Sequence, residues 1–268
     1  ASLGVTQDRR AVGDPDQLVS VEAGAVLGDV VAAPALAGRV AVLARRHRFD
    51  EGSAIAQLAD AIRAGDSGST LDLLRGGGVL RWIRPDDAAA VRALQAELVT
   101  AAVDVVDAAV AGRVGDAQRS AEQVKVLAAL RRRPGGVHDW TSRIESGVAS
   151  ARSVPLHERW YVGRPVLVTA NDPLNHVSNG DTGVVVADGQ GGRTVALGPA
   201  EQPHLVAPGR LDAVDTWWAM TVHKSQGSEY PHVVVSLPEV DVPVDNRELL
   251  NAAVTRAREQ VKVVASEA

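Results

Sequence analysis

The chain has 268 residues, 46% of them hydrophobic and 23% charged, a globular composition that excludes disordered, collagen-like and coiled-coil proteins. The absence of cysteine excludes disulfides, thiolate nucleophiles and zinc–thiolate sites. A net charge of −5 argues against a protein that coats nucleic acid through bulk positive charge, although a local basic groove remains possible. No apolar run approaches the roughly 20 residues of a membrane helix, so we expect a cytoplasmic protein without a membrane partner.

The first elements combine turns, helices and one short strand. A Gly-Asp-Pro turn at 13–15 is expected to follow a strand end, and an alanine-rich helix is expected to run from 20 toward 37. Residues 40–43 predict a short buried strand that leads into the basic segment 45–49. A helix over 53–65 follows, with serine at its amino end and glycine at its carboxyl end.

The middle of the chain alternates strands and helices. Three glycines at 76–78 precede a predicted strand at 79–83 and a long helix over 85–111. Residues 123–130 predict another buried strand, which ends in the basic turn 131–136. This alternation favours a parallel sheet with helices on both faces, and hence an α/β fold.

The pattern changes to short strands separated by glycine-rich turns after residue 163. The predicted strands are 164–170, 182–187, 193–197 and 204–207. They indicate a small antiparallel β-barrel that is inserted in the α/β domain. The α/β pattern then resumes with a strand ending near 222, a short helix at 223–229, a strand at 232–237, a helix at 246–257 and a strand at 260–265.

In segment 218–229 a predicted buried strand ends in a run of polar residues and glycine. Ligand sites of α/β proteins lie at the carboxyl edge of the sheet, so this segment is a candidate site. An ordinary solvated turn is the alternative. It is the poorer interpretation because one of only three lysines, Lys224, falls here among several other polar groups.

A second candidate segment, 248–259, ends a predicted helix with Arg256 and Arg258. Arginines at this position can simply interact favourably with the helix dipole. Alternatively, one of them is an arginine finger that stabilises charge on a phosphoryl group during its transfer. The residues alone leave both interpretations open.

Four segments together resemble the conserved motifs of superfamily 1 DNA helicases, in the family's order. Residues 13–21, 45–49, 218–229 and 248–259 resemble motifs III, IV, V and VI. The finer resemblance is to the RecD family, the alpha subunits of exodeoxyribonuclease V. It includes GDPDQLVSVEAG from residue 13, HRF from residue 47 with the helix that follows, and WAMTVHKSQGSE from residue 218. The resemblance implies a RecA-like, P-loop-NTPase-type sheet with an SH3-like barrel inserted.

The resemblance also implies roles at the nucleotide, which would be ATP with Mg²⁺. Gln17 would be the motif III glutamine that senses the γ-phosphate. Arg48 and Arg256 would reach the γ-phosphate across the cleft between two motor domains, and Gly227 and Glu229 would lie on the nucleotide side of motif V.

Single-stranded DNA would lie on the other side of motif V. The residues that would face it are Thr221, His223, Lys224 and Ser225. Helicases of this family grip the strand mainly through its backbone, by hydroxyls, amides and a few cations, which a net-negative protein with a local groove can do.

The resemblance covers only part of a helicase. The phosphate-binding GxxxxGK[ST] loop and the acidic Mg²⁺ motif, which belong to the first motor domain of the polypeptide, do not occur in the chain. Residues 1–37 are therefore expected to end the first motor domain, 38–163 and 211–268 to form the second, and 164–210 to form the barrel. We expect this chain alone not to hydrolyse ATP.

The intact protein is expected to be an ATP-dependent helicase that moves 5′ to 3′ and works with RecB-like and RecC-like subunits at double-strand breaks. One alternative is a non-catalytic fragment that binds DNA or docks on partner subunits. Another is a different superfamily 1 helicase, which would share motifs V and VI but fit the HRF helix less well.

Two features outside the motifs allow a structural and a functional interpretation. Trp217 and Trp218 could stack on bases, but their position beside a buried strand predicts core or domain-interface residues. The arginines at 131–133 could touch phosphates, although a basic loop is usually a solvated turn.

Overall fold

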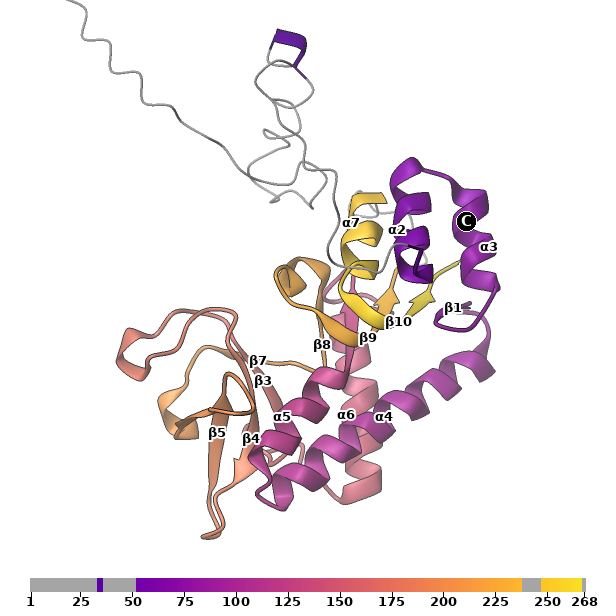
Figure 1. The fold of residues 1–268 in the computed structure, drawn as a ribbon. Coiled ribbons are helices and arrows are strands. Elements are labelled where there is room, and N and C mark those ends of the chain that lie inside the picture. Colours follow the sequence, from indigo (N-terminus) through magenta and orange to yellow (C-terminus); the bar gives the residue numbers. More distant parts are fainter. Residues whose placement is uncertain (1–32, 36–51, 238–246, 267–268) are drawn as a thin grey trace, which may run out of the picture. The chain divides into compact units, whose positions relative to one another are not determined.

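The computed structural model describes residues 33–35, 52–237 and 247–266 (Figure 1). The predicted site residues Gln17 and Arg48 lie outside these ranges, as does the predicted strand at 40–43. The chain divides into two compact units, Ala1–Arg48 and Phe49–Ala268. The elements described below all belong to the second unit.

Five parallel strands form the larger sheet, in the order β1-β10-β9-β2-β8. The strands are β1 (Leu80–Ile83), β2 (Val124–Ala128), β8 (Ala219–Thr221), β9 (Tyr230–Ser236) and β10 (Ala257–Val264). The central strands β2 and β9 are buried almost throughout, as expected where helices cover both faces of a parallel sheet. The predicted α/β class with a parallel sheet is confirmed.

Two groups of helices cover the parallel sheet. Figure 1 shows α2 (Ala54–Ala64), α3 (Ser67–Arg75) and α7 (Arg247–Val254) on one face, and α4 (Ala88–Val110), α5 (Val114–Gln123) and α6 (Val137–Arg152) on the other. The crossovers from β1 to β2 and from β9 to β10 run in opposite directions along the sheet. Right-handed connections therefore place their helices on opposite faces. Among the described helices, none combines the length and the apolar character required to span a bilayer.

Helix α2 shows why its ends could be predicted. The Ser53 hydroxyl accepts a hydrogen bond from the Ala56 amide at 3.3 Å, which satisfies one of the free N–H groups of the first turn. Gly65 ends the helix in the left-handed region at φ 72°, where a side chain would be unfavourable. The predicted helix at 53–65 is confirmed.

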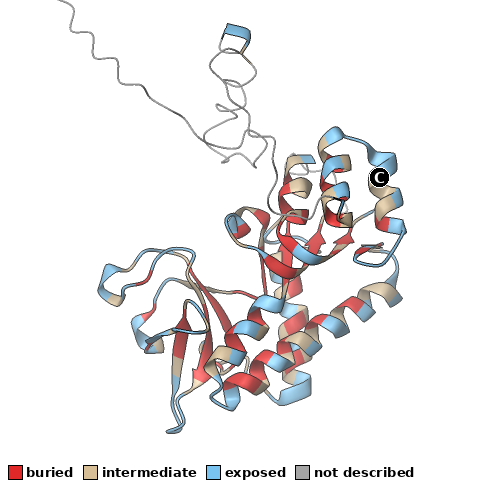
Figure 2. Cartoon of the chain, viewed as in Figure 1, coloured by how far each residue is buried: buried red, intermediate tan, exposed pale blue. Residues whose placement is uncertain are grey.

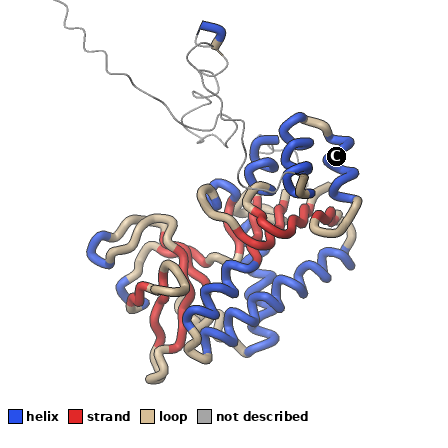
Figure 3. Tube along the Cα trace, in the orientation of Figure 1, coloured by secondary structure: helices blue, strands red, loops and turns tan. Residues whose placement is uncertain are grey.

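A second, antiparallel sheet has the strand order β6-β5-β4-β3-β7 and lies in the chain between α6 and β8 (Figure 3). Its strands are β3 (Pro165–Val168), β4 (Thr182–Ala187), β5 (Arg193–Leu197), β6 (His204–Val206) and β7 (Val214–Thr216). The inserted antiparallel sheet is confirmed. Strand β7 extends it past the predicted end at residue 210, and among the described residues β6 and β7 are edges that do not pair to close a barrel.

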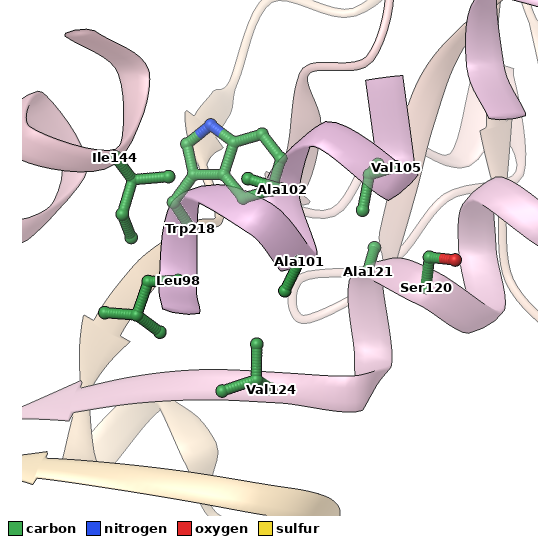
Figure 4. Close-up of a pocket in the computed structure, with 9 residues that line it drawn as sticks. All are labelled: Leu98, Ala101, Ala102, Val105, Ser120, Ala121, Val124, Ile144 and Trp218. Atoms are coloured by element: carbon green, nitrogen blue, oxygen red, sulfur yellow. The ribbon is translucent and has the colours of Figure 1, made fainter. Parts of the chain in front are cut away.

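Each sheet has its own apolar core, and Figure 2 shows buried residues along both sets of strands. Valines and leucines of β3, β4 and β5 form the core of the antiparallel sheet. Trp217 and Trp218, between β7 and β8, are 3% and 7% exposed, as expected for core or domain-interface residues. Figure 4 shows Trp218 beside Ile144 of α6 and Ala102 of α4, at a small cavity of about 10 Å³.

One lysine is buried in the parallel sheet. Lys125 of β2 is 1% exposed, and its ammonium donates to the Trp217 carbonyl at 2.8 Å and to the Ala121 carbonyl at 3.1 Å. The ammonium also lies 3.3 Å from the centroid of the Trp217 ring, a cation–π contact. Burial lowers the pKa of Lys125 well below its ordinary value of 10.5.

This lysine makes the stability of the protein depend on pH. Its pKa is lower in the folded than in the unfolded protein, so the unfolded state binds more protons between the two values and the free energy of unfolding rises with pH there. Lys125→Met removes this dependence. The substitution removes the cost of burying the amine but leaves two carbonyls unpaired, opposing effects of about 1–3 kcal/mol each. We therefore expect near-neutral stability at pH 7 and increasing destabilisation relative to wild type toward pH 10.

Urea unfolding of both proteins at pH values from 7 to 10 measures this difference. The remaining titratable groups are shared, so their effects cancel when the two curves are subtracted. Parallel curves over the whole range would contradict the assignment to Lys125.

Candidate functional site

The predicted motif V segment lies at the carboxyl edge of the parallel sheet. Strand β8 ends at Thr221, which is in register with Ala128 at the end of β2. The chain then turns into a short 3-10 helix, η4 (Val222–Ser225), and the Thr221 hydroxyl caps it by accepting from the Lys224 amide at 3.4 Å. Parallel strands that end together place these polar groups where α/β proteins bind ligands.

The four residues predicted to face DNA differ in their exposure. Lys224 is exposed, while Thr221 and His223 are half-buried. Ser225 is fully buried, and its hydroxyl donates to the Val222 carbonyl at 2.6 Å. In this arrangement Thr221 and Lys224 present side chains to a groove, whereas the Ser225 hydroxyl serves the local turn.

The structure brings motif VI beside motif V through Arg256. This residue lies in the turn between α7 and β10 and is 5% exposed. Its guanidinium donates to the Ala252 carbonyl at 3.1 Å and to the Ser228 carbonyl at 3.4 Å. Ser228 stands between Gly227 and Glu229, the two residues predicted for the nucleotide side. These two residues and Arg256 therefore gather at the amino ends of β9 and β10, the edge of the sheet opposite Thr221.

Gly227 has a backbone reason to be glycine. Its φ is +85°, in the left-handed region, and a Cβ built on it would meet no atom within 4 Å. The conformation, rather than lack of space, therefore favours glycine at this turn. The open side leaves backbone accessible beside Glu229, which is exposed.

A groove of about 340 Å³ runs between the two sheets, next to η4. It is lined by parts of α6, β3, β7 and β8. Its polar and charged lining includes the cations Arg131, Arg164 and Lys224, the imidazole of His138, and the hydroxyls of Thr141, Ser142, Thr216 and Thr221. Hydroxyls with a few cations are the groups that hold a sugar–phosphate backbone.

Two carboxylates, Asp215 and Glu145, also line the groove. Asp215 of β7 accepts from the Lys224 ammonium at 2.8 Å and from the Arg131 guanidinium at 3.2 Å, both through the same oxygen, Oδ2. The three side chains come from the antiparallel sheet, from η4 and from the loop after β2. The ion pairs thus join the two sheets at the groove.

The groove wall contains a buried polar network that the sequence did not indicate. Arg164, 8% exposed, donates to the Thr216 hydroxyl at 3.0 Å, and burial lowers its pKa. The Tyr161 hydroxyl donates to Glu145 at 2.8 Å and accepts from the Trp218 indole at 3.0 Å. Burial raises the pKa of Tyr161 well above its ordinary value, so the phenol remains protonated. No spacing or motif in the sequence marks these residues.

A metal site is not evident in the described part of the chain. Within residues 33–35, 52–237 and 247–266 no group of three or more His, Asp or Glu is placed to hold a metal ion. Cations and hydroxyls outnumber the carboxylates Glu145 and Asp215 in the lining of the groove, a balance that suits phosphates.

Two family descriptions match the chain. The UvrD-like helicase C-terminal domain matches residues 216–264, which contain β8, η4, β9, α7 and β10. An AAA domain matches residues 6–85.

Curated relatives match nearly all of this chain. The RecBCD enzyme subunit RecD of Mycolicibacterium smegmatis is 45% identical over 258 residues, which are 96% of this chain and 45% of that protein. The subunit of the same name from Mycobacterium tuberculosis H37Rv is 46% identical over 96% of this chain and 44% of its own length. The ATP-dependent RecD2 DNA helicase of Deinococcus radiodurans is 31% identical over 51% of this chain and 19% of its own. The chain therefore spans less than half the length of the RecD subunits that it matches.

Solved structures with some similarity include two of Pif1 helicases. Bacteroides Pif1 in complex with ADP-AlF3 and single-stranded DNA matches 84% of this chain and 51% of its own, with 14% identity and a TM-score of 0.41. A structure of two coordinating Pif1 helicases at forked double-stranded DNA matches 82% and 48%, with 14% identity and a TM-score of 0.40.

Proposed function

Because the chain belongs with the RecD-type superfamily 1 DNA helicases, we propose that it is the carboxy-terminal motor portion of an ATP-dependent helicase of this type. The observation that carries the proposal is the β8–η4 segment. It lies at the carboxyl edge of the parallel sheet beside the cationic groove, and residues 226–229 lead from it to the start of β9, where the Ser228 carbonyl accepts from Arg256. One segment can therefore sense both the nucleotide and the strand.

The proposal divides the chain as follows. Residues 1–37 end the first motor domain, 38–163 and 211–268 form the second, and 164–210 form the inserted unit. The antiparallel pairing of β7 with β3 supports moving the end of the inserted unit from 210 to 216.

At the nucleotide, Arg256 is the proposed arginine finger, with Gln17 and Arg48 as further γ-phosphate contacts that lie outside the described residues. The guanidinium donors of Arg256 and the open backbone at Gly227 fit an anionic ligand, and the proposal places Glu229 on the same side. ATP with Mg²⁺ supplies the free energy for movement, and the first motor domain would hold the Mg²⁺. Arg256 would exchange its carbonyl partners for phosphate oxygens and so stabilise charge on the transferring group.

At the strand, the groove supports backbone contacts from motif V. Thr221 and Lys224 line it, and the proposal adds the half-buried His223. Ser225, which is buried, would support the turn that presents these residues. The proposal is completed by movement of the enzyme along the strand in the 5′ to 3′ direction, by partnership with RecB-like and RecC-like subunits at double-strand breaks, and by a cytoplasmic location. They rest on the relatives named RecBCD enzyme subunit RecD.

A competing proposal is a piece that binds DNA or docks on partners without hydrolysing ATP. It is favoured by the groove, which is complete within the second unit of the chain and needs no nucleotide. ATP hydrolysis by the purified chain, with and without single-stranded DNA and Mg²⁺, separates the possibilities. Hydrolysis by this chain alone would contradict a half-motor that depends on its first domain, and its absence agrees with both proposals. Restoration of hydrolysis by addition of the upstream domain favours the motor.

Binding of the strand in the groove predicts the effect of Lys224→Ala. Loss of one phosphate contact weakens binding of oligonucleotides of different sequence by similar factors. It also makes the negative slope of log K against log salt shallower by about 1. Fluorescence anisotropy with labelled oligo(dT) and mixed-sequence strands at several salt concentrations measures both quantities. Arg119→Ala is the control, since Arg119 lies on α5, pairs with Asp116 and does not line the groove. Equal weakening of DNA binding by Lys224→Ala and Arg119→Ala would show that the strand does not lie in the groove.

A further inference from the structure

A carboxylate occupies the most cationic point of the proposed DNA groove. Asp215 Oδ2 accepts from two cations, Lys224 at 2.8 Å and Arg131 at 3.2 Å. A backbone phosphate of a strand in this groove is also an anion and would seek the same donors. The carboxylate and the strand therefore compete for one place.

The geometry around Asp215 is that of a phosphate site. One oxygen receives an N–H from an arginine and one from a lysine, as a non-bridging phosphate oxygen commonly does. The two cations come from separate segments, the loop after β2 and η4, and they repel each other unless an anion lies between them. The observed arrangement thus needs an anion, which Asp215 supplies.

The ion pairs are weak enough to exchange. The side chains of Arg131, Asp215 and Lys224 are 58%, 44% and 34% exposed. Ion pairs with this exposure contribute little to stability, because water and salt screen them. These ion pairs therefore contribute little to the fold around the groove, and an incoming phosphate can replace the carboxylate without unfolding it.

We propose that Asp215 is an internal stand-in for a DNA phosphate, and that Arg131 and Lys224 form a phosphate site which the strand enters by displacing the carboxylate. This inference rests on the proposed function, and it adds Arg131 and Asp215 to the motif V residues. Asp215 lowers the affinity for the strand and keeps the two cations in place between binding events. Displacement also breaks the ion-pair link between the antiparallel and the parallel sheet at the groove.

Asp215→Asn tests the proposal in this chain. Asparagine keeps the shape of the side chain but removes the charge that competes with the phosphate. We expect single-stranded oligo(dT) of about 15 nucleotides to bind roughly three- to tenfold more tightly at 50 mM salt, and the gain to shrink at 300 mM salt as charges are screened. Fluorescence anisotropy gives both affinities, and thermal unfolding checks that the variant folds.

Asp212→Asn is the matched control. Asp212 is exposed, lies three residues away and does not line the groove, so it makes the same change in net charge at a neighbouring position. Asp215→Asn combined with Arg131→Ala tests the partner, and we expect most of the gain to be lost. Equal gains in Asp212→Asn and Asp215→Asn, or unchanged affinity in Asp215→Asn while the wild type binds DNA, would overturn the inference alone. Failure of every protein, the wild type included, to bind DNA would overturn the proposed function and the inference with it.

Discussion

Replacement of Arg256 by alanine is expected to lower ATP turnover by about 10³-fold or more, in a polypeptide that also carries the upstream motor domain. The planar guanidinium spreads its positive charge over the oxygens of the transferring phosphoryl group, and alanine leaves that charge uncompensated. The structure places Arg256 beside motif V, with its donors on the Ala252 and Ser228 carbonyls. Steady-state hydrolysis with saturating single-stranded DNA measures the effect.

Two further variants make this result specific. Arg258→Ala removes an arginine two residues away that is exposed, and it should leave turnover within a fewfold of wild type. Arg256→Lys keeps a positive charge but loses the planar fork, so an intermediate loss is expected. Because Arg256 is 5% exposed, thermal unfolding must show that each variant is folded. Near-normal turnover in a folded Arg256→Ala protein would remove this residue from catalysis.

Gly163→Ala is expected to destabilise the protein by about 2–5 kcal/mol, the sum of backbone strain and overpacking. Gly163 has a φ of +91°, which side-chain-bearing residues rarely adopt. A Cβ there would lie 2.5 Å from Cγ2 and 2.8 Å from Cα of Val106, so the backbone of α4 blocks it. Urea-induced unfolding gives the change in free energy.

The contribution of the clash can be measured separately. Gly180 has a φ of +100° but no atom within 4 Å of a built Cβ, so Gly180→Ala carries the conformational cost alone. We expect it to lose about 1–2 kcal/mol. Equal losses of stability at both positions would show that α4 moves to accommodate the methyl group at Gly163, which would contradict a clash with Val106.

Elements with local signals could be predicted from the sequence. Strands β4 and β5 have the predicted bounds, because glycine-containing turns flank short apolar runs. Helices α5 and α6 and strand β7 were not predicted. The residues before the two helices, Arg113 and Gly136, make no side-chain cap bond, and the three residues of β7 are only half-buried. Such elements depend on tertiary packing, which leaves little local pattern.

The candidate site also has some features that the sequence predicts and others that it does not. Its location at the end of β8 followed from an apolar strand with polar residues directly after it, as in segment 218–229. The bonds of Arg256 to Ser228 and of Asp215 to Arg131 join residues 28 and 84 positions apart, so no spacing rule could predict them. The roles of Gln17 and Arg48 stay predictions, since both lie outside the described residues.

The connection between β7 and β8 is only two residues long, Trp217 and Trp218, and both are buried and hydrogen-bonded. The Trp217 carbonyl is held by Lys125, and the Trp218 indole by Tyr161. This connection therefore has no spare residues. A force that pulls β7 acts directly on β8 and the first residues of motif V. Natural changes in chain length should be absorbed in exposed turns such as 188–192, where added residues reach solvent. At the tryptophan pair a single inserted residue would shift β8 out of register with β2, turn its side chains to the opposite faces and disconnect the two sheets mechanically.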